Sequence, residues 1–367
     1  MKRRIALFLA AIMLMGVFTA CSKTPDPTNA PTNAPTEAAK PTDAATEAPT
    51  EAAPKEITGE VNIYMASSED CAIAWKEGFE AAYPGVTLNY VMLGGGEILT
   101  RLRAEKDNPQ ADAIVGGAVD IYMNASKEGL LAPYEGDVVL KDGAIAEDKT
   151  YIVDRECILG ICYDKDWYDA NGVAYPTTWD DLLIPELEGQ VIITNPGTST
   201  TGYMMMSSLI ALRGEEAGMK YMVDLDKNIK SYAKGGTGPV NSVSLGEAAA
   251  GMCYIHFAIQ LQEQGYTNVG VCIPTEGTGV EQGSSALVAN SKNPDAAQAF
   301  MDWYLTEGLK VYEEVGQYLY PANPDVHVHE VAAEYAKQLK NANVDYAWAA
   351  ENYDRLVEIW DASIADK

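Results

Sequence analysis

Positive charge is scarce in this sequence, and that scarcity limits the partners that its surface can attract. The 367 residues include 26 Lys and Arg against 53 Asp and Glu, which gives a formal net charge of −27 at pH 7. Such a surface repels the phosphates of nucleic acids and the headgroups of anionic lipids. The composition argues against nucleic-acid binding and against membrane binding through surface charge, although a single pocket can still hold an anion through local dipoles.

Known catalytic motifs are also missing. The sequence has no Gly-x-Ser-x-Gly, no His-Glu-x-x-His and no set of kinase signatures, and only three histidines are available as bases. Two of these, His327 and His329, are separated by one residue. Any extended segment can have this spacing without binding a metal. We therefore expect no enzyme activity, no metal site and no cofactor.

The first apolar run is too short for a stable membrane-spanning helix. Residues 5–18 are mostly apolar and follow the basic residues 2–4, and small residues then lead to Cys21. This is the pattern of a secretory signal peptide. A cysteine at the cleavage point is typical of a bacterial lipoprotein. We expect residues 1–20 to be removed and Cys21 to be lipidated, which anchors the protein outside the cytoplasm, on the outer face of the cell membrane. The alternative is plain secretion with Cys21 as an ordinary thiol.

Large apolar side chains are absent from residues 22–56. This segment consists mainly of Thr, Ala, Pro and Glu in loose repeats without an apolar period. It cannot bury enough apolar surface to offset its ordering entropy. Residues 21–56 are therefore expected to form a lipidated cysteine followed by a disordered stalk.

Cysteine is also infrequent. Five cysteines follow Cys21, an odd number that cannot pair completely within one chain, and their spacing matches no zinc motif. Buried free thiols are favoured, and a single disulfide among them stays possible. These residues are Cys71, Cys157, Cys162, Cys253 and Cys272.

The remaining residues, 57–367, are numerous enough for two lobes. Apolar strands at residues 61–65, 86–92 and 113–115 alternate with helical patterns, which predicts a parallel sheet with helices on both faces. A long apolar helix is expected at residues 245–264 and a returning strand at residues 285–289. Two helices, around residues 331–340 and 347–364, are expected to finish the chain.

The strongest site signal lies in residues 195–202, which follow a predicted strand and open a predicted helix. Four consecutive hydroxyl residues stand there: Thr198, Ser199, Thr200 and Thr201. The first N–H groups of a helix have no internal partner and favour phosphate, phosphonate or carboxylate groups. We expect these residues to bind an anion, although capping the helix requires only one of them.

Glycines and serines between strands and helices give a weaker signal. The run that contains Gly95 and Gly96 lets the backbone approach a ligand closely, but it lacks the Gly-Lys-Ser/Thr of a phosphate-binding P-loop. Ser67 and Ser68 follow the first strand, at the sheet edge where open α/β folds bind ligands. All four residues are expected to contact the ligand, Gly95 and Gly96 from the other lobe, and a tight turn is the alternative for the glycines.

Two titratable residues complete the predicted site. His256 lies in an apolar stretch, and Glu276 follows a strand in a Gly-rich loop, where its carboxylate could accept hydrogen bonds from ligand hydroxyls or an amine. A buried core histidine and a solvated loop carboxylate are the alternatives.

Several segments together resemble the ferric-ion-binding branch of the type II periplasmic binding proteins. They are GGGEILTRLRAEKDNPQADAIVGG, NPGTSTTGY, NSVSLGEAAAGMCYIH, PTEGTG and GQYLYPANPDV. That branch also contains 2-aminoethylphosphonate-binding and hexose-phosphate-binding receptors.

The resemblance implies an extracellular solute-binding lipoprotein of an ABC transporter. It predicts two α/β lobes, each a mainly parallel sheet flanked by helices, joined by hinge strands that close around one ligand. We assign residues 57–153 to lobe 1, residues 154–274 to lobe 2, and residues 275–367 to the return to lobe 1 and the C-terminal helices. The expected partners are permease transmembrane subunits and ATPase subunits, with the protein itself a monomer.

The resemblance also bears on the ligand. In ferric members two adjacent tyrosines hold the metal, and here those positions are His256 and Phe257, which do not supply the anionic oxygens that Fe³⁺ requires. In hexose-phosphate members a histidine, an aspartate and a later glutamate contact the sugar. His256 and Glu276 match that arrangement, whereas Phe257 replaces the aspartate. We therefore expect a small phosphonate or phosphorylated solute. Ferric iron or an iron chelate is one alternative, and a receptor that signals to a membrane kinase is another.

Overall fold

The computed structural model describes residues 57–364, and the predicted signal peptide, Cys21 and the whole predicted stalk lie outside these residues. The described residues form one compact unit. Within the described residues, no helix combines the length and the apolar character needed to cross a membrane. The five cysteines of this part are all buried and free, as the sequence favoured.

Three parallel strands and three helices open the unit, and they confirm the predicted βαβαβα order. The strands are β1 (Gly59–Ala66), β2 (Val86–Met92) and β3 (Ala113–Ala118), and the helices are α1 (Glu69–Ala82), α2 (Gly95–Ala104) and α3 (Val119–Lys127). Helix α1 buries Trp75 and Phe79, one turn apart on one face. This region is the first lobe.

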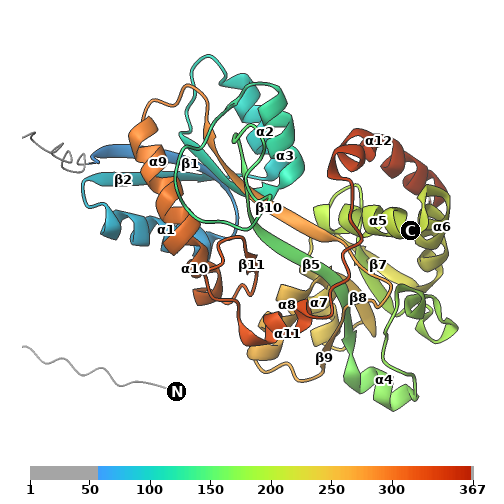
Figure 1. Ribbon diagram of the computed structural model, residues 1–367. Helices are drawn as coiled ribbons and strands as arrows, with labels where there is room; N and C mark the ends of the chain where they lie inside the picture. Colours follow the sequence, from blue (N-terminus) through green and yellow to red (C-terminus); the bar gives the residue numbers. More distant parts are fainter. Residues whose placement is uncertain (1–56, 365–367) are drawn as a thin grey trace, which may run out of the picture. The chain divides into compact units, whose positions relative to one another are not determined.

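Two long strands connect this lobe to the next. Strands β5 (Ile152–Asp164) and β10 (Val280–Val288) are antiparallel to each other, and β10 also pairs with β3. The first half of β5, up to Ile158, pairs with β10, and the second half, from Leu159, pairs with strands of the second lobe. Figure 1 shows both strands running between the lobes, as expected for hinge strands.

The second lobe is a mixed sheet with helices around it. Its strands are β6 (Val191–Thr194), β7 (Ile229–Ala233), β8 (Ala250–Tyr254) and β9 (Val269–Cys272), and its helices are α4 (Lys165–Asn171), α5 (Thr200–Arg213), α6 (Glu215–Leu225), α7 (Gly238–Ser244) and α8 (Ile255–Glu263). Strand β6 is parallel to β7 and β8, whereas β8 and β9 are antiparallel to β5. A 3₁₀ helix at Trp179–Leu183 begins with a capping box at Thr178.

The single long helix predicted at residues 245–264 is wrong. A loop, strand β8 and helix α8 occupy these residues instead. All five residues of β8 are buried, and a Cβ on Gly251 would lie 2.8 Å from the carbonyl oxygen of Ile192 in the neighbouring strand. A fully buried strand has the same continuous apolar pattern as a buried helix, so hydrophobic periodicity cannot separate the two.

The chain then returns to the first lobe and ends in further helices. These elements are α9 (Pro294–Trp303), a π-helical turn (Tyr304–Gly308), α10 (Leu309–Glu314), the short strand β11 (Tyr320–Pro321), α11 (Glu330–Ala336) and α12 (Tyr346–Ser363). Another short strand, β4 (Leu131–Ala132), follows α3 and pairs with β10. Helices α9 and α10 pack on β1 and α1, whereas α12 contacts α3 of the first lobe and α6 of the second.

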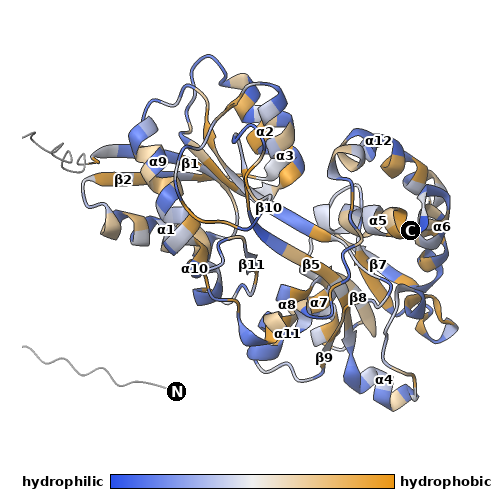
Figure 2. Ribbon diagram, viewed as in Figure 1, coloured by the Kyte–Doolittle hydropathy of each residue, from blue (hydrophilic) through white to orange (hydrophobic). Residues whose placement is uncertain are grey.

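Helix α12 is amphipathic and contributes a wall to the space between the lobes. Its buried residues, Ala349, Leu356 and Trp360, recur at helical spacing. In Figure 2 the helix carries both hydrophilic and hydrophobic colours, and Figure 1 places it beside α5 and α6. The Arg355 guanidinium makes two bonds to the Glu215 carboxylate, of 2.6 and 3.0 Å, which fix α12 to α6.

Candidate ligand-binding site

A cavity of about 390 Å³ lies where elements of both lobes meet. Its walls come from the start of α3, the start of α5, the beginning of β10 and the C-terminal helix α12. A volume of this size is in the range of small-molecule sites. Polar residues among those that line it include Asp120, Thr198, Ser199, Thr200, Ser207 and Glu281.

The N-terminus of α5 opens onto this cavity. Ser199 occupies the N-cap position but makes no capping hydrogen bond with its side chain. The first N–H groups of the helix therefore make no hydrogen bond to that hydroxyl. They also have no acceptor within the helix, because the first turn has no preceding carbonyl groups. The partial positive charge of this terminus is thus available to an anion.

The loop before α5 is held close to the helix. The Asn195 side-chain oxygen accepts a hydrogen bond from the Gly197 N–H at 2.8 Å, and its carbonyl oxygen accepts from the N–H groups of Thr198 and Ser199. A Cβ on Gly202 would lie 2.6 Å from the Thr194 carbonyl oxygen. Only glycine at this position lets the loop pack so closely against the first turn.

The four hydroxyl residues predicted to bind an anion lie together at this terminus. Thr198, Ser199 and Thr200 line the cavity. Thr201 is buried in the first turn of α5. The structure therefore places the strongest predicted site at a cavity between the lobes.

Three carboxylates from other elements also line the cavity. Asp120 comes from the first turn of α3, Glu281 from β10 and Asp354 from α12. Burial raises the pKa of Asp120 and of Glu281, and the nearby Asp120 charge adds to the increase at Glu281. The Tyr254 hydroxyl donates a hydrogen bond to Glu281. None of the described residues that line the cavity is Lys, Arg or His.

Three tyrosines give the cavity an aromatic wall. Tyr203 belongs to α5, and Tyr346 and Tyr353 belong to α12. The rings of Tyr203 and Tyr353 pack edge to face, with centroids 4.7 Å apart. Burial raises the pKa of Tyr203 to about 12, so these phenols stay neutral near neutral pH. The sequence analysis did not select these tyrosines, although the spacing of seven between Tyr346 and Tyr353 places them on one helix face.

The glycines and serines predicted in lobe 1 lie elsewhere among the described residues. A Cβ on Gly95 would lie 2.3 Å from the Ile121 side chain, so this turn packs against α3, and Gly96 faces open space. Ser68 is the N-cap of α1 and accepts hydrogen bonds from the Cys71 N–H and from the Gln317 amide. Ser67 is half-buried after β1 and does not line the cavity.

His256 is a buried residue near the cavity but does not line it. Its ring stacks on Tyr254, with centroids 6.0 Å apart, and contacts Phe257. Burial, and then the charge of Arg155, lower the pKa of His256 to about 3, so the imidazole is neutral near neutral pH. Its Nδ1 atom is buried without a hydrogen-bond partner. Tyr254 links it to Glu281.

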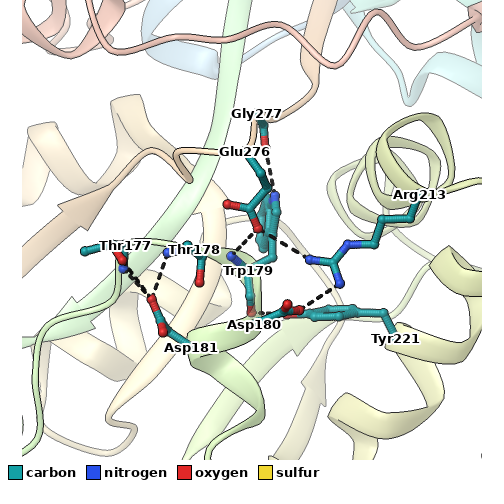
Figure 3. A network of polar contacts seen from close by, with 9 residues as sticks. All are labelled: Thr177, Thr178, Trp179, Asp180, Asp181, Arg213, Tyr221, Glu276 and Gly277. Carbon is teal, nitrogen blue, oxygen red and sulfur yellow. Dashed lines mark hydrogen bonds and ion pairs between the residues drawn. The ribbon is translucent and has the colours of Figure 1, made fainter.

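Glu276 belongs to a network that braces the second lobe. Its Oε1 accepts hydrogen bonds from the Trp179 backbone N–H at 2.8 Å and from Arg213 at 3.4 Å, as Figure 3 shows. Arg213 also bonds Asp180 at 2.7 Å and lies over the Tyr221 ring. The structure places Glu276 in this network and not among the residues that line the cavity.

The buried cation on strand β5 already has an ion-pair partner. Arg155 on β5 makes a 2.7 Å ion pair with Asp154, and both side chains are buried. Its guanidinium also lies 5.2 Å from the Tyr312 ring centroid. In the described part of the chain no group of three or more His, Cys, Asp or Glu residues could hold a metal ion.

Comparison with known proteins gives a consistent family. Residues 66–311 match the family model described as bacterial extracellular solute-binding protein. An uncharacterized protein of Haemophilus influenzae is 28% identical over 312 residues, which are 82% of this chain and 90% of that protein. A periplasmic protein of Salmonella typhimurium, named for binding 2-aminoethylphosphonate, is 29% identical over 146 residues, 39% of this chain and 41% of its own length.

Solved structures share the fold. The periplasmic binding protein AfuA of Actinobacillus pleuropneumoniae, with fructose-6-phosphate bound, is 27% identical, with a TM-score of 0.74, and the match covers 84% of this chain and 99% of AfuA. Iron-bound HitA of Pseudomonas aeruginosa is 18% identical with a TM-score of 0.72, covering 82% and 99% of the two chains, and supports the fold alone.

These matches confirm the predicted two-lobe fold of type II periplasmic binding proteins. Members of this kind bind a solute outside the cytoplasm and work with the permease and ATPase subunits of an ABC importer. The chain belongs to the family of bacterial extracellular solute-binding proteins.

Proposed function

We propose that this protein captures a small solute with a phosphate or phosphonate group in the cavity between its lobes and delivers it to an ABC permease. The anionic group binds at the N-terminus of α5, next to Thr198, Ser199 and Thr200. Contacts from both lobes stabilise the closed form, because a ligand favours the state in which it makes more contacts. The protein carries out no chemistry on the solute.

The single observation that carries this proposal is the uncapped start of α5. The N-cap hydroxyl of this helix makes no capping hydrogen bond, and the helix N-terminus lies at the wall of a cavity large enough for a small ligand. Its free N–H groups and its dipole can therefore bind an anion. Phosphate and phosphonate satisfy several such donors at once, with three oxygens each. The fructose-6-phosphate in AfuA and the 2-aminoethylphosphonate named for the Salmonella relative support the same ligand class.

Ferric iron fits the cavity less well. Hard Fe³⁺ prefers anionic oxygen ligands, and phenols become such ligands only on losing a proton. Burial raises the pKa of Tyr203 to about 12 and also raises the pKa of Tyr353 and Tyr346, which opposes that step. Iron-citrate therefore belongs in the test as the competing ligand.

We also propose that lipid on Cys21 holds the mature protein, as a monomer, on the outer face of the cell membrane. The residue pattern before Cys21 supports this proposal. Cells fed a labelled fatty acid should attach it to the wild-type protein and not to Cys21→Ala. Equal labelling of the two proteins, or labelling of neither, would contradict lipid anchoring at Cys21.

A thermal-shift screen of the purified protein tests the ligand class. Carried-over ligand is removed first by partial unfolding and dialysis, and the panel contains sugar phosphates, phosphonates, phosphoglycerate and iron-citrate. A ligand that binds only the folded state stabilises it by about 2.7 kcal/mol at a hundredfold excess over Kd.

We expect at least one phosphate or phosphonate compound to raise the melting temperature, and we expect the double variant Thr198→Ala/Thr200→Ala to lose most of that shift. The matched control is Thr100→Ala, which removes an exposed hydroxyl from α2, outside the cavity. A shift with iron-citrate alone, or an undiminished shift in the double variant, would contradict the proposal.

A further inference from the structure

The cavity has an unusual charge balance for a site that receives an anion. Asp120, Glu281 and Asp354 line it, and none of these carboxylates forms an ion pair in the described part of the chain. No described lining residue carries a positive charge. A ligand with only negative charge would meet these carboxylates without compensation.

Two of the carboxylates are partly removed from water. Asp120 and Glu281 are half-buried, and burial disfavours their charged forms. An unpaired charge in such a place is costly, and the cost is relieved when a cation enters. Glu281 lines the same cavity as Thr200, which belongs to the proposed anion site. A positive group must therefore come close to the anionic group.

The arrangement favours an organic cation over a metal ion. The three carboxylates come from α3, β10 and α12, and they do not converge into a group that could hold a metal. The Tyr203, Tyr346 and Tyr353 rings share the cavity, and aromatic faces attract ammonium groups. Ser207 independently indicates a ligand. This residue lines the cavity and is 4% exposed, and its hydroxyl has no hydrogen-bond partner.

We propose that Asp120, Glu281 and Asp354 form a cation subsite, which binds a protonated nitrogen of the same solute whose phosphate or phosphonate binds at α5. The substrate class is then a zwitterion, an amine-bearing phosphonate or phosphate ester, rather than a plain sugar phosphate. This inference rests on the proposed function, since it needs an anionic group at α5. The proposal assigns the amine-bearing part of the ligand to residues that include Asp354 of the C-terminal helix and Asp120 of lobe 1.

Isothermal titration with matched ligand pairs tests this proposal. One pair is 2-aminoethylphosphonate and n-propylphosphonate, which differ by an ammonium group in place of a methyl group. The other is glucosamine 6-phosphate and glucose 6-phosphate, which differ by an ammonium group in place of a hydroxyl group. We expect the amine-bearing member of at least one pair to bind at least about tenfold more tightly, as a hydrogen-bonded charge pair does.

Variants then locate the subsite. Asp354→Asn and Asp120→Asn should each reduce the preference for the amine. Asp361→Asn should leave it unchanged, because Asp361 lies on the same helix as Asp354 but does not line the cavity. Circular dichroism shows whether each variant is folded. If one of the two variants does not fold, the other still tests the proposal.

The outcomes separate the two proposals. Equal affinity within both pairs, or a preference that survives both variants, would overturn the cation subsite and leave the anion site intact. Binding of no compound from either pair or from the wider phosphorylated panel would overturn the proposed function and the subsite together.

Discussion

The Tyr353 hydroxyl of α12 donates a 3.0 Å hydrogen bond to the carbonyl oxygen of Gly197, across 156 residues of sequence. A second bond runs in the opposite direction, from the Tyr203 hydroxyl of α5 to the carbonyl oxygen of Ala349 in α12. The C-terminal helix is thus fixed to the loop that positions the anion site. The position of α12 and the binding of a solute at α5 should therefore depend on each other.

Changing Tyr353→Phe removes this bond and keeps the ring. We expect the affinity for the phosphorylated ligand to fall about fivefold, which corresponds to a lost hydrogen bond of about 1 kcal/mol. Titration calorimetry measures this change. The control is Tyr266→Phe, because Tyr266 is exposed and does not line the cavity. An affinity equal to that of the wild type would show that α12 does not help to order the loop.

Changing Gly202→Ala should damage the anion site. The new Cβ would lie 2.6 to 2.9 Å from backbone atoms of residues 194–196, so the loop must move away from α5. We expect a loss of stability of about 1 to 3 kcal/mol and a loss of ligand affinity of about tenfold or more. Urea unfolding and titration calorimetry measure the two effects.

The matched control is Gly96→Ala, in the first turn of α2, where a Cβ would meet nothing within 4 Å. It should leave both quantities nearly unchanged. This control also tests the sequence-based prediction that Gly96 contacts the ligand, because a strong loss of affinity in Gly96→Ala would favour that prediction.

The start of α5 was easier to predict from the sequence than the other walls of the cavity. Helix starts and their hydroxyl residues are local features, so residues 195–202 could be located without a structure. Asp120, Glu281, Asp354 and the tyrosines of α12 come together only because β10 and α12 bring distant segments to the same cavity. Sequence periodicity predicts which face of each helix is buried. It does not predict which other element packs against that face.

Glu276 makes contacts that hold parts of the second lobe together. We expect Glu276→Gln to lower the free energy of unfolding by about 1 kcal/mol, because Arg213 and the Trp179 N–H lose a charged acceptor. Ligand affinity should stay within experimental error. Glu186→Gln, at an exposed carboxylate of the same lobe, serves as the control for unfolding. A loss of affinity at unchanged stability would instead support the sequence-based prediction.

His256 should make stability depend on pH. Burial and the charge of Arg155 lower its pKa from 6.5 to about 3, and its other ring neighbours are Tyr254 and Phe257. The unfolded chain therefore binds a proton below pH 6.5 that the folded chain does not bind. The resulting stability is present above pH 6.5 and is lost as the pH falls toward 3.

Urea unfolding of the wild type and of His256→Phe at several pH values measures this effect. The wild type should lose about 1.4 kcal/mol per pH unit relative to the variant below the unfolded pKa. The control is His327→Phe, because Glu313 raises the pKa of the exposed His327, so that any slope has the opposite sign. Parallel curves for the wild type and His256→Phe would show that the imidazole is not buried in its neutral form.

The two-lobe fold followed from alternating strand and helix patterns in the first lobe, but the second lobe was harder to predict. Strand β8 and helix α8 form one apolar stretch, in which period and composition do not mark the boundary. Tertiary pairing with β5 and β6 selects the strand. The family resemblance, carried by segments within this stretch and on both sides of it, gave the correct fold despite the local error.

Backbone amide shifts in a ¹H–¹⁵N NMR titration test the central claim most directly. The ligand is the phosphate or phosphonate compound that gives the largest thermal shift. The account predicts that the N–H signals of Thr200 and Thr201 move downfield on binding, because they donate to the bound anion, while the signals of Gly95 and Gly96 move little. Large shifts at Gly95 and Gly96 with none at Thr200 and Thr201 would contradict the assignment of the anion site to α5.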